Sequence, residues 1–272
     1  MKHINSLVLL CSIYLLTIVM GLHTAAFIQP LMYPPKGGEP VIQPAVDDPE
    51  SVSSAGYFFV SILAITFVML VFMKYRLGFF IKAAMLVSFF TGTLFTSTAL
   101  FGDAGVIIPI VFSALILLRF KSELFYDVVL VFTISGVGAL LGSSLGLVPA
   151  LVLVVIMSVY DFVAVFFTKH MVSLAKGAVE GGVPMMFAVP VGDRFMHLGA
   201  GDVALPLTLS VSVMASQGII YAIPTALGGV IGIITLFSYI QNKKGATLPA
   251  LPPIVGGQLI GYGLAILVQA ML

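Results

Sequence analysis

Two aspartates stand out in the apolar second half of the chain, because carboxyl groups in such surroundings can carry out acid–base chemistry. Asp161 lies inside the apolar run 151–167, and Asp202 opens the next apolar run. A carboxylate at the centre of a bilayer-spanning helix costs on the order of 2.5 to 3.5 kcal/mol on insertion scales, so each residue needs a reason to be there. One polar contact between helices would explain either aspartate alone. Two aspartates in successive apolar runs indicate that the two carboxyl groups act together in one reaction.

Composition assigns the chain to the integral membrane proteins. Hydrophobic residues make up 60% of the sequence and charged residues 8%, and the mean hydropathy is +1.17. No water-soluble core of this length buries that much apolar surface. The net charge of +1 offers no basic surface for nucleic acid. The single Cys11 excludes an internal disulfide, and the histidines lack the HExxH spacing of a zinc protease, so we expect no metal and no cofactor.

The apolar runs have the length of membrane-spanning helices, which need roughly 20 residues. They predict an all-α polytopic protein with one membrane domain, 1–272, and nine transmembrane helices. The predicted spans are 6–28, 55–73, 83–101, 104–118, 126–145, 149–170, 199–216, 218–240 and 252–271. A signal peptide is the alternative for the first span, but its apolar stretch exceeds the 7 to 15 residues of a typical signal core, which favours a retained anchor.

The basic residues orient these spans. Of the 12 Lys and Arg residues, all but Lys36 fall on one side of the predicted topology. That side carries Lys2, Lys74, Arg76, Lys82, Arg119, Lys121, Lys169, Lys176, Arg194, Lys243 and Lys244. The positive-inside rule therefore predicts a multi-pass protein of the cell membrane with a cytoplasmic N-terminus and an extracytoplasmic C-terminus. The proline-rich loop 29–54 is then extracytoplasmic and irregular, and the loop 171–198 is cytoplasmic.

This topology sets the depth of the two aspartates. Asp161 lies roughly 18 Å along a span that enters from outside, and Asp202 lies one turn inside the cytoplasmic edge of the next span. Consecutive antiparallel helices are usually neighbours, so the carboxyl groups are expected to face each other. Like charges at short range cannot both ionise, so the pair shares one proton. One group can then act as base on a water and the other as acid to a carbonyl oxygen, which is the arrangement of an aspartic protease.

Three short motifs surround these positions. Tyr160-Asp161, Gly199-Ala200-Gly201-Asp202 and Pro249-Ala250-Leu251 resemble, in order and spacing, the YD, GxGD and PAL motifs of the presenilin and signal peptide peptidase family of intramembrane aspartyl proteases. Each motif alone is weak. Tyr126-Asp127 is a second YD, near a cytoplasmic helix end, where we expect a surface position. The first five spans agree with the family only in hydropathy. The chain most resembles a prokaryotic, archaeal presenilin homologue, because no long hydrophilic insertion separates the sixth and seventh spans.

The resemblance implies intramembrane proteolysis with Asp161 and Asp202 as the catalytic dyad. Gly199 and Gly201 would leave room for a helix or a peptide backbone to approach Asp202, although helix packing alone would also explain them. Pro249-Ala250-Leu251 would hold substrate in irregular backbone next to a wet cavity, and an ordinary helix start is the alternative.

Two further features are Tyr160, which has two explanations, and a set of glycines, which has one. Tyr160 either hydrogen-bonds near the dyad or packs elsewhere as an amphipathic side chain. Gly228, Gly229 and Gly232, with Gly257 and Gly261, form small-residue faces in the last two spans. These faces predict close helix packing, with no role in chemistry.

The cytoplasmic loop contains an apolar, β-compatible segment between Pro184 and Pro190. Its central residues are Met185, Met186, Phe187, Ala188 and Val189. A spanning helix hides its peptide bonds in its own hydrogen bonds, so a protease must supply replacement partners when it unwinds the helix. We expect the segment to add a strand to the unwound substrate, with the backbone before Pro249 as a second edge. A loop lying on the bilayer surface is the alternative.

Two other function classes compete with intramembrane proteolysis. Transporters and ion channels also carry intramembrane acids, but this chain has no clear internal repeat. Prepilin peptidases also pair aspartates, but they are expected to carry a lysine where this chain has Ala204. The expected partners are transmembrane helical substrates and membrane lipid. The sequence is compatible with a homo-oligomer and implies no accessory subunit.

Overall fold

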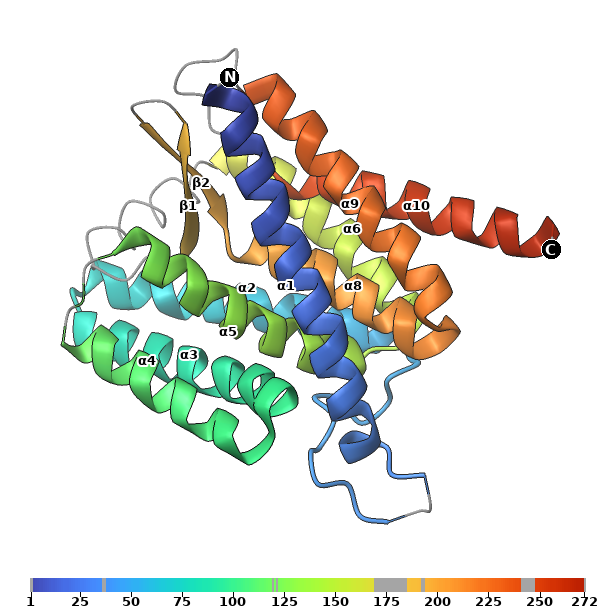
Figure 1. Cartoon of the computed structure of the whole chain (residues 1–272), viewed down its shortest axis with the longest axis horizontal. Coiled ribbons are helices and arrows are strands. Elements are labelled where there is room, and N and C mark those ends of the chain that lie inside the picture. The colour runs from blue at the N-terminus through green and yellow to red at the C-terminus, as the bar shows by residue number, and fades with distance from the viewer. Residues whose placement is uncertain are drawn as a thin grey trace.

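The computed structural model describes residues 2–35, 38–118, 120, 122–168, 185–191, 194–240 and 248–271. These residues form a bundle of long helices with one small antiparallel sheet beside it (Figure 1). The helices are α1 (Lys2–Met32), α2 (Val52–Lys74), α3 (Gly78–Phe101), α4 (Ile107–Leu117), α5 (Glu123–Ser143), α6 (Leu147–Val163), α8 (Gly201–Gln217), α9 (Ile219–Ile240) and α10 (Leu251–Met271). A 3-10 helix, η1 (Gly102–Val106), joins α3 to α4, and a π-helical turn, η2 (Ala164–Thr168), ends α6.

Each of the nine predicted spans overlaps one of these helices, but fewer helical runs are long enough to cross a membrane. Within the described residues, 7 helical runs are long and apolar enough to span a bilayer. One run, Gly78–Leu117, combines α3, η1 and α4. α8 has 17 residues, slightly below the roughly 20 that a spanning helix needs. A mostly helical, polytopic architecture is confirmed, and the number of nine spans stays a prediction.

α8 lies in the interior of the bundle, which explains its mixed composition. Every side chain from Leu205 to Val213 is buried, so protein must cover the helix on all sides. α1, α5, α6 and α9 contact it. Its hydroxyl groups donate to backbone oxygens, as Thr208 does to Ala204 at 2.9 Å and Ser212 does to Leu145 at 2.9 Å. A helix that satisfies its polar groups in this way can remain in a dry interior.

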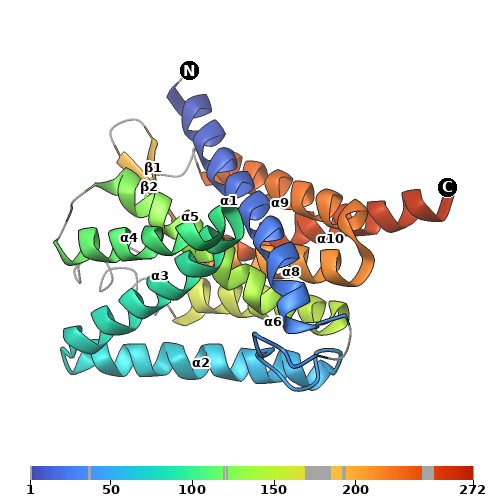
Figure 2. The same ribbon diagram turned by 60° about the horizontal axis from the view of Figure 1, so that its bottom comes forward.

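The connection between α1 and α2 has no regular secondary structure in its described part, as its prolines predicted. It docks on the turn between α5 and α6. Tyr33 Oη donates to the Ser143 carbonyl at 3.3 Å, Ala45 N–H donates to Ser144 Oγ at 3.1 Å, and Gly146 N–H donates to the Pro49 carbonyl at 2.8 Å. α2 itself lies at the edge of the bundle, beside α6 (Figure 2).

The described part of the connection between α6 and α8 contains a β-hairpin. β1 (Met186–Val191) pairs antiparallel with β2 (Arg194–Gly199), with Phe187 opposite Leu198 and Val189 opposite Met196. The β conformation expected for this segment is therefore present. Figure 1 shows the hairpin at the end of the bundle where the N-terminus lies, opposite the connection between α1 and α2. β2 leads through Ala200 into α8, so the hairpin is joined directly to the helix that carries Asp202.

Glycines bring α9 and α10 into close contact, as their spacing predicted. A Cβ on Gly228 would overlap the backbone oxygen of Gly257, and a Cβ on Gly261 would overlap that of Pro224. Only a residue without a side chain allows two helix backbones to approach this closely. This contact holds α10 at a fixed distance from α9 and fixes the start of α10 relative to the rest of the bundle.

We expect Gly257→Ala to destabilise the protein by about 1 to 3 kcal/mol, the usual cost of overpacking, because the added methyl group would overlap the Gly228 backbone. Gly256→Ala is the matched control on the same helix, since its Cβ would meet nothing within 4 Å. Thermal unfolding in detergent measures the difference. Equal unfolding temperatures for the two variants would contradict the close contact.

Candidate active site

Asp161 lies near the end of α6 and accepts hydrogen bonds from the start of α10. Its side chain is buried, with 6% of its surface exposed. The backbone N–H of Leu251 donates to Asp161 Oδ2 at 3.2 Å, and the N–H of Ala250 also hydrogen-bonds to this carboxyl. The first backbone N–H groups of a helix have no partner within the helix. Because Pro252 and Pro253 carry no N–H, Ala250 and Leu251 are the donors available at this helix start, and both are used by Asp161.

Asp202 lies in the first turn of α8, where the helix dipole favours a carboxylate. The backbone N–H of Gly199 hydrogen-bonds to its carboxyl. A Cβ on Gly199 would lie 2.8 Å from Asp202 Oδ2, so the absence of a side chain at this position lets the carboxyl rest against the backbone. The end of β2 and the start of α8 thus form one unit around Asp202.

Asp161 lies close enough to Asp202 to act electrostatically on its carboxyl group. The two residues come from neighbouring helices, since α6 and α8 pack together. Each carboxyl accepts backbone N–H groups, which fix its orientation without adding a neutralising cation. Two such groups in an apolar setting share a proton, and the pair can act together as acid and base on a water and a carbonyl compound.

The other predicted site residues lie around this pair with different contacts. The ring of Tyr160 packs edge-to-face on Phe59 of α2, with 6.2 Å between centroids, and its hydroxyl bonds to no other described residue. Gly201 is exposed, and a Cβ on it would meet nothing within 4 Å. Pro249 and Ala250 are buried ahead of α10. The segment Pro249-Ala250-Leu251 thus touches Asp161 directly, a contact that the sequence alone did not predict.

The hairpin changes the expectation for Met185 to Val189. Ala200 N–H donates to the Met185 carbonyl, so the hydrogen-bonded pairs of the ladder include Phe187 with Leu198 and Val189 with Met196. The backbone groups of Ala188 and Pro190 therefore point away from β2, to the opposite edge of β1. That edge is also occupied: Ala188 N–H donates to Asp127 Oδ1 at 2.9 Å, and Ser6 Oγ donates to the Pro190 carbonyl. Substrate pairing by this segment stays a prediction, and it would have to displace these two hydrogen bonds.

The burial of Phe187 limits how substrate pairing by this segment can be tested. Its side chain is fully buried, with 0% exposed, and its backbone faces β2. Replacing it with proline would remove a ladder bond inside the hairpin together with a large buried side chain. Loss of a buried Phe typically costs about 3 to 5 kcal/mol, so Phe187→Pro would destabilise the fold and cannot isolate substrate pairing.

Asp127 also differs from the expectation of a surface residue. Its side chain is 7% exposed and accepts the Ala188 N–H. The sequence contained a signal for this role, since Asp127 lies about one turn inside an apolar run. A carboxyl group there needs a partner even when it is not part of a catalytic pair.

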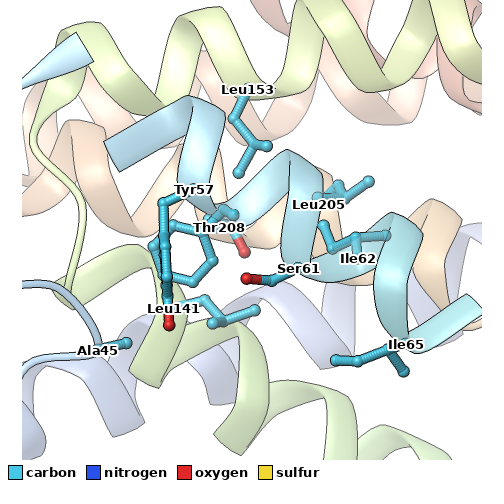
Figure 3. A pocket seen from close by; sticks show the side chains of 10 residues that line it. Ala45, Tyr57, Ser61, Ile62, Ile65, Leu141, Leu153, Leu205 and Thr208 are labelled. Carbon is cyan, nitrogen blue, oxygen red and sulfur yellow. The ribbon is translucent and has the colours of Figure 1, made fainter. Parts of the chain in front are cut away.

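A cavity of about 410 Å³ lies between α2, α5, α6 and α8. Leu205 and Thr208 of α8 line it, three and six residues after Asp202, and Leu153 of α6 lines it eight residues before Asp161. Figure 3 shows the hydroxyl groups of Tyr57, Ser61 and Thr208 among otherwise apolar side chains. Ala45, from the connection between α1 and α2, also borders the cavity. An apolar space of this size, next to the helices that carry both aspartates, suits the side chains of a bound peptide.

Comparison with known proteins assigns the chain to a family. Residues 17–271 match the family described as signal-peptide peptidase, presenilin aspartyl protease. The chain is thus by class an intramembrane aspartyl protease. Because the match extends over nearly the whole length, the chain belongs to the signal-peptide peptidase and presenilin family. No curated protein gives a significant match.

Two solved structures have a similar fold, and both are described as a presenilin family intramembrane aspartate protease. The one in space group C222 has a TM-score of 0.65 and 23% identity, over 95% of this chain and 96% of that chain. The one in space group P2 has a TM-score of 0.64 and 24% identity, over 94% of this chain and 97% of that chain. At this identity the likeness shows the fold, and it confirms the presenilin-like architecture.

Proposed function

We propose that this protease cleaves peptide bonds within single-span transmembrane helices, with Asp161 and Asp202 as its catalytic dyad. The observation that carries the proposal is the placement of two carboxyl groups on the packed helices α6 and α8. The Leu251 N–H holds Asp161 at 3.2 Å, and the Asp202 carboxyl rests against the backbone of Gly199. A pair held in this way needs little reorganisation when charge develops during the reaction.

The reaction follows from the shared proton. The ionised carboxyl takes a proton from a water, whose oxygen bonds to the carbonyl carbon of the scissile peptide. The protonated carboxyl gives its proton to the carbonyl oxygen, which forms a tetrahedral diol. The C–N bond then breaks as the nitrogen receives a proton, and the products are a carboxylic acid and an amine. No covalent bond to the enzyme is needed.

A helical substrate must present its backbone to the dyad in an unwound form. The apolar cavity beside Leu205 and Leu153 suits the part of the substrate that stays helical. The unwound part needs hydrogen-bond partners, and the outer edge of β2 offers them. The backbone groups of Phe195 and His197 point away from β1 and bond to no other described residue. We therefore assign strand addition to β2, which leads directly to Asp202.

The charge distribution supports an orientation with the N-terminus in the cytoplasm and the C-terminus outside. The hairpin and the dyad then lie toward the cytoplasmic side, so substrate helices are cut in their cytoplasmic half. We expect the chain to form one membrane domain with nine spans in contact with lipid. We expect the chain to act without an accessory subunit or cofactor.

Cleavage of a defined peptide tests the proposal. The purified chain is incubated in detergent with a single-span helical peptide, and the products are mapped by mass spectrometry. We expect two complementary fragments from a cut inside the span. If the peptide stays intact while the protein conducts ions in liposomes, the protein is a transporter or channel and the proposal fails.

The shared proton predicts a bell-shaped dependence of cleavage on pH. The reaction needs one protonated and one ionised carboxyl, so activity should fall at low pH, where both are protonated, and at high pH, where both are ionised. Initial rates across the acid to alkaline range, in a detergent that preserves the fold, measure this profile. A rate independent of pH would argue against the dyad.

A further inference from the structure

The outer edge of β1 is held by side chains from two helices that are distant in the sequence. Asp127 of α5 accepts the Ala188 N–H at 2.9 Å, and Ser6 of α1 donates to the Pro190 carbonyl. Both bonds lie on the edge opposite β2, because residues 187 and 189 face β2. β1 is thus bounded by a strand on one side and by helix side chains on the other.

A buried carboxyl is an unusual means of binding one backbone N–H. Asp127 is 7% exposed, and no described Lys, Arg or His side chain forms an ion pair with it. A neutral serine or threonine would satisfy the same N–H at a lower desolvation cost. The carboxyl offers a stronger, charge-assisted bond, which holds the strand more firmly in place.

The position of β1 is linked to Asp202 through a short series of backbone contacts. Ala200 N–H donates to the Met185 carbonyl at 3.0 Å, so the base of the hairpin is closed just before α8 begins. Gly199, the last residue of β2, binds the Asp202 carboxyl. A shift of β1 would therefore move the base of the hairpin and the β2 edge that ends beside Asp202.

We propose that Asp127 is a positioning residue for proteolysis. It anchors the outer edge of β1, with Ser6 beside it, so that the hairpin stays fixed against the bundle and presents only the β2 edge to an unwound substrate next to Asp202. This role rests on the proposed function, because it concerns how that site holds its substrate. The anchor also closes the second edge of β1, which would otherwise pair with a peptide out of register.

Substitution of Asp127 tests the anchor. Asp127→Ala removes the acceptor, and we expect kcat/KM for a single-span substrate to fall on the order of tenfold or more, as for loss of a hydrogen bond to a charged group. The set of cleavage positions, mapped by mass spectrometry, should become broader. Asp127→Asn keeps an oxygen acceptor and should restore much of the activity and a single main cleavage position. Asp103→Asn is the control, since it neutralises an exposed carboxyl in η1.

A second variant removes the same hydrogen bond by changing its donor in β1. Ala188→Pro removes the N–H that binds Asp127, and this N–H does not belong to the ladder with β2. The losses from Asp127→Ala and Ala188→Pro should not add in the double variant, because both remove one interaction. Additive losses, or an Asp127→Ala enzyme with the parental rate and cleavage positions, would overturn the proposal.

A short peptide that carries a hydroxyl group in place of the scissile carbonyl separates this proposal from the proposed function. Such a peptide binds the dyad but is too short to reach the hairpin. We expect Asp127→Ala to bind it as the parental enzyme does, which also shows that the variant is folded. Equal loss of peptide binding and cleavage would mean that Asp127 only stabilises the fold, and the positioning role would be wrong. Failure of the parental enzyme to bind the peptide would instead reject the dyad.

Discussion

Replacing either aspartate of the proposed dyad with asparagine is expected to abolish cleavage. Asp161→Asn or Asp202→Asn removes the proton that the two carboxyls share, so neither the activated water nor the acid is available. We expect kcat to fall at least about 10⁴-fold, the scale seen when one member of a catalytic unit is lost. The double variant should be no slower than either single variant, because residues that act as a unit do not contribute additively. Fragment formation from a single-span peptide measures these rates.

The fold should survive both substitutions, because asparagine keeps an oxygen that can accept the N–H groups of Leu251 and Gly199. Circular dichroism and elution from a sizing column check this. Asp103→Asn serves as a control, since it neutralises an exposed carboxyl in η1. A single dyad variant with turnover near that of this control would reject the assignment of the dyad.

The second large effect is expected at the open edge of β2. His197→Pro removes an N–H that points away from β1, so the ladder within the hairpin keeps its bonds. Proline is tolerated at an edge strand when its nitrogen faces outward. An unwound substrate would lose a backbone partner and meet the proline ring. We expect cleavage of a helical substrate to fall about tenfold or more, the loss of roughly one to two hydrogen bonds.

His197→Ala is the matched control, because it removes the exposed imidazole and keeps the backbone N–H. It should cleave at nearly the parental rate. Thermal unfolding of both variants shows whether the hairpin is intact. Equal rates for His197→Pro and the parental enzyme, with both folded, would reject strand addition at β2.

The sequence predicted the helical bundle and singled out Asp161 and Asp202 because both inferences depend on local patterns. Apolar runs of bilayer length define helices without reference to their neighbours. Asp161 and Asp202 were identifiable because carboxyl groups are costly in such runs. The close contact of α9 and α10 followed from the spacing of Gly228 and Gly257, since a missing side chain is visible in the sequence.

The contacts of the site were harder to predict, because they join residues that lie far apart in the chain. The bond from Leu251 to Asp161 spans 90 residues, and the bond from Ala188 to Asp127 spans 61. The β conformation of Met186 to Val191 was readable from its composition. Which edge of the strand stays open depends on Asp127 and Ser6, and no local pattern reports on those partners. For this reason the sequence predicted a surface position for Asp127, although its side chain is buried.

Binding of a peptide that carries a hydroxyl group in place of the scissile carbonyl tests the dyad most directly. The affinity of this peptide is compared with that of the same peptide lacking the hydroxyl, for the parental enzyme and for Asp161→Asn and Asp202→Asn. Mimics of a tetrahedral intermediate bind at least about 10²-fold tighter than ground-state analogues. We predict that the hydroxyl adds this factor in the parental enzyme and adds nothing in either variant. Equal affinities for the two peptides in the parental enzyme would contradict the two-aspartate mechanism.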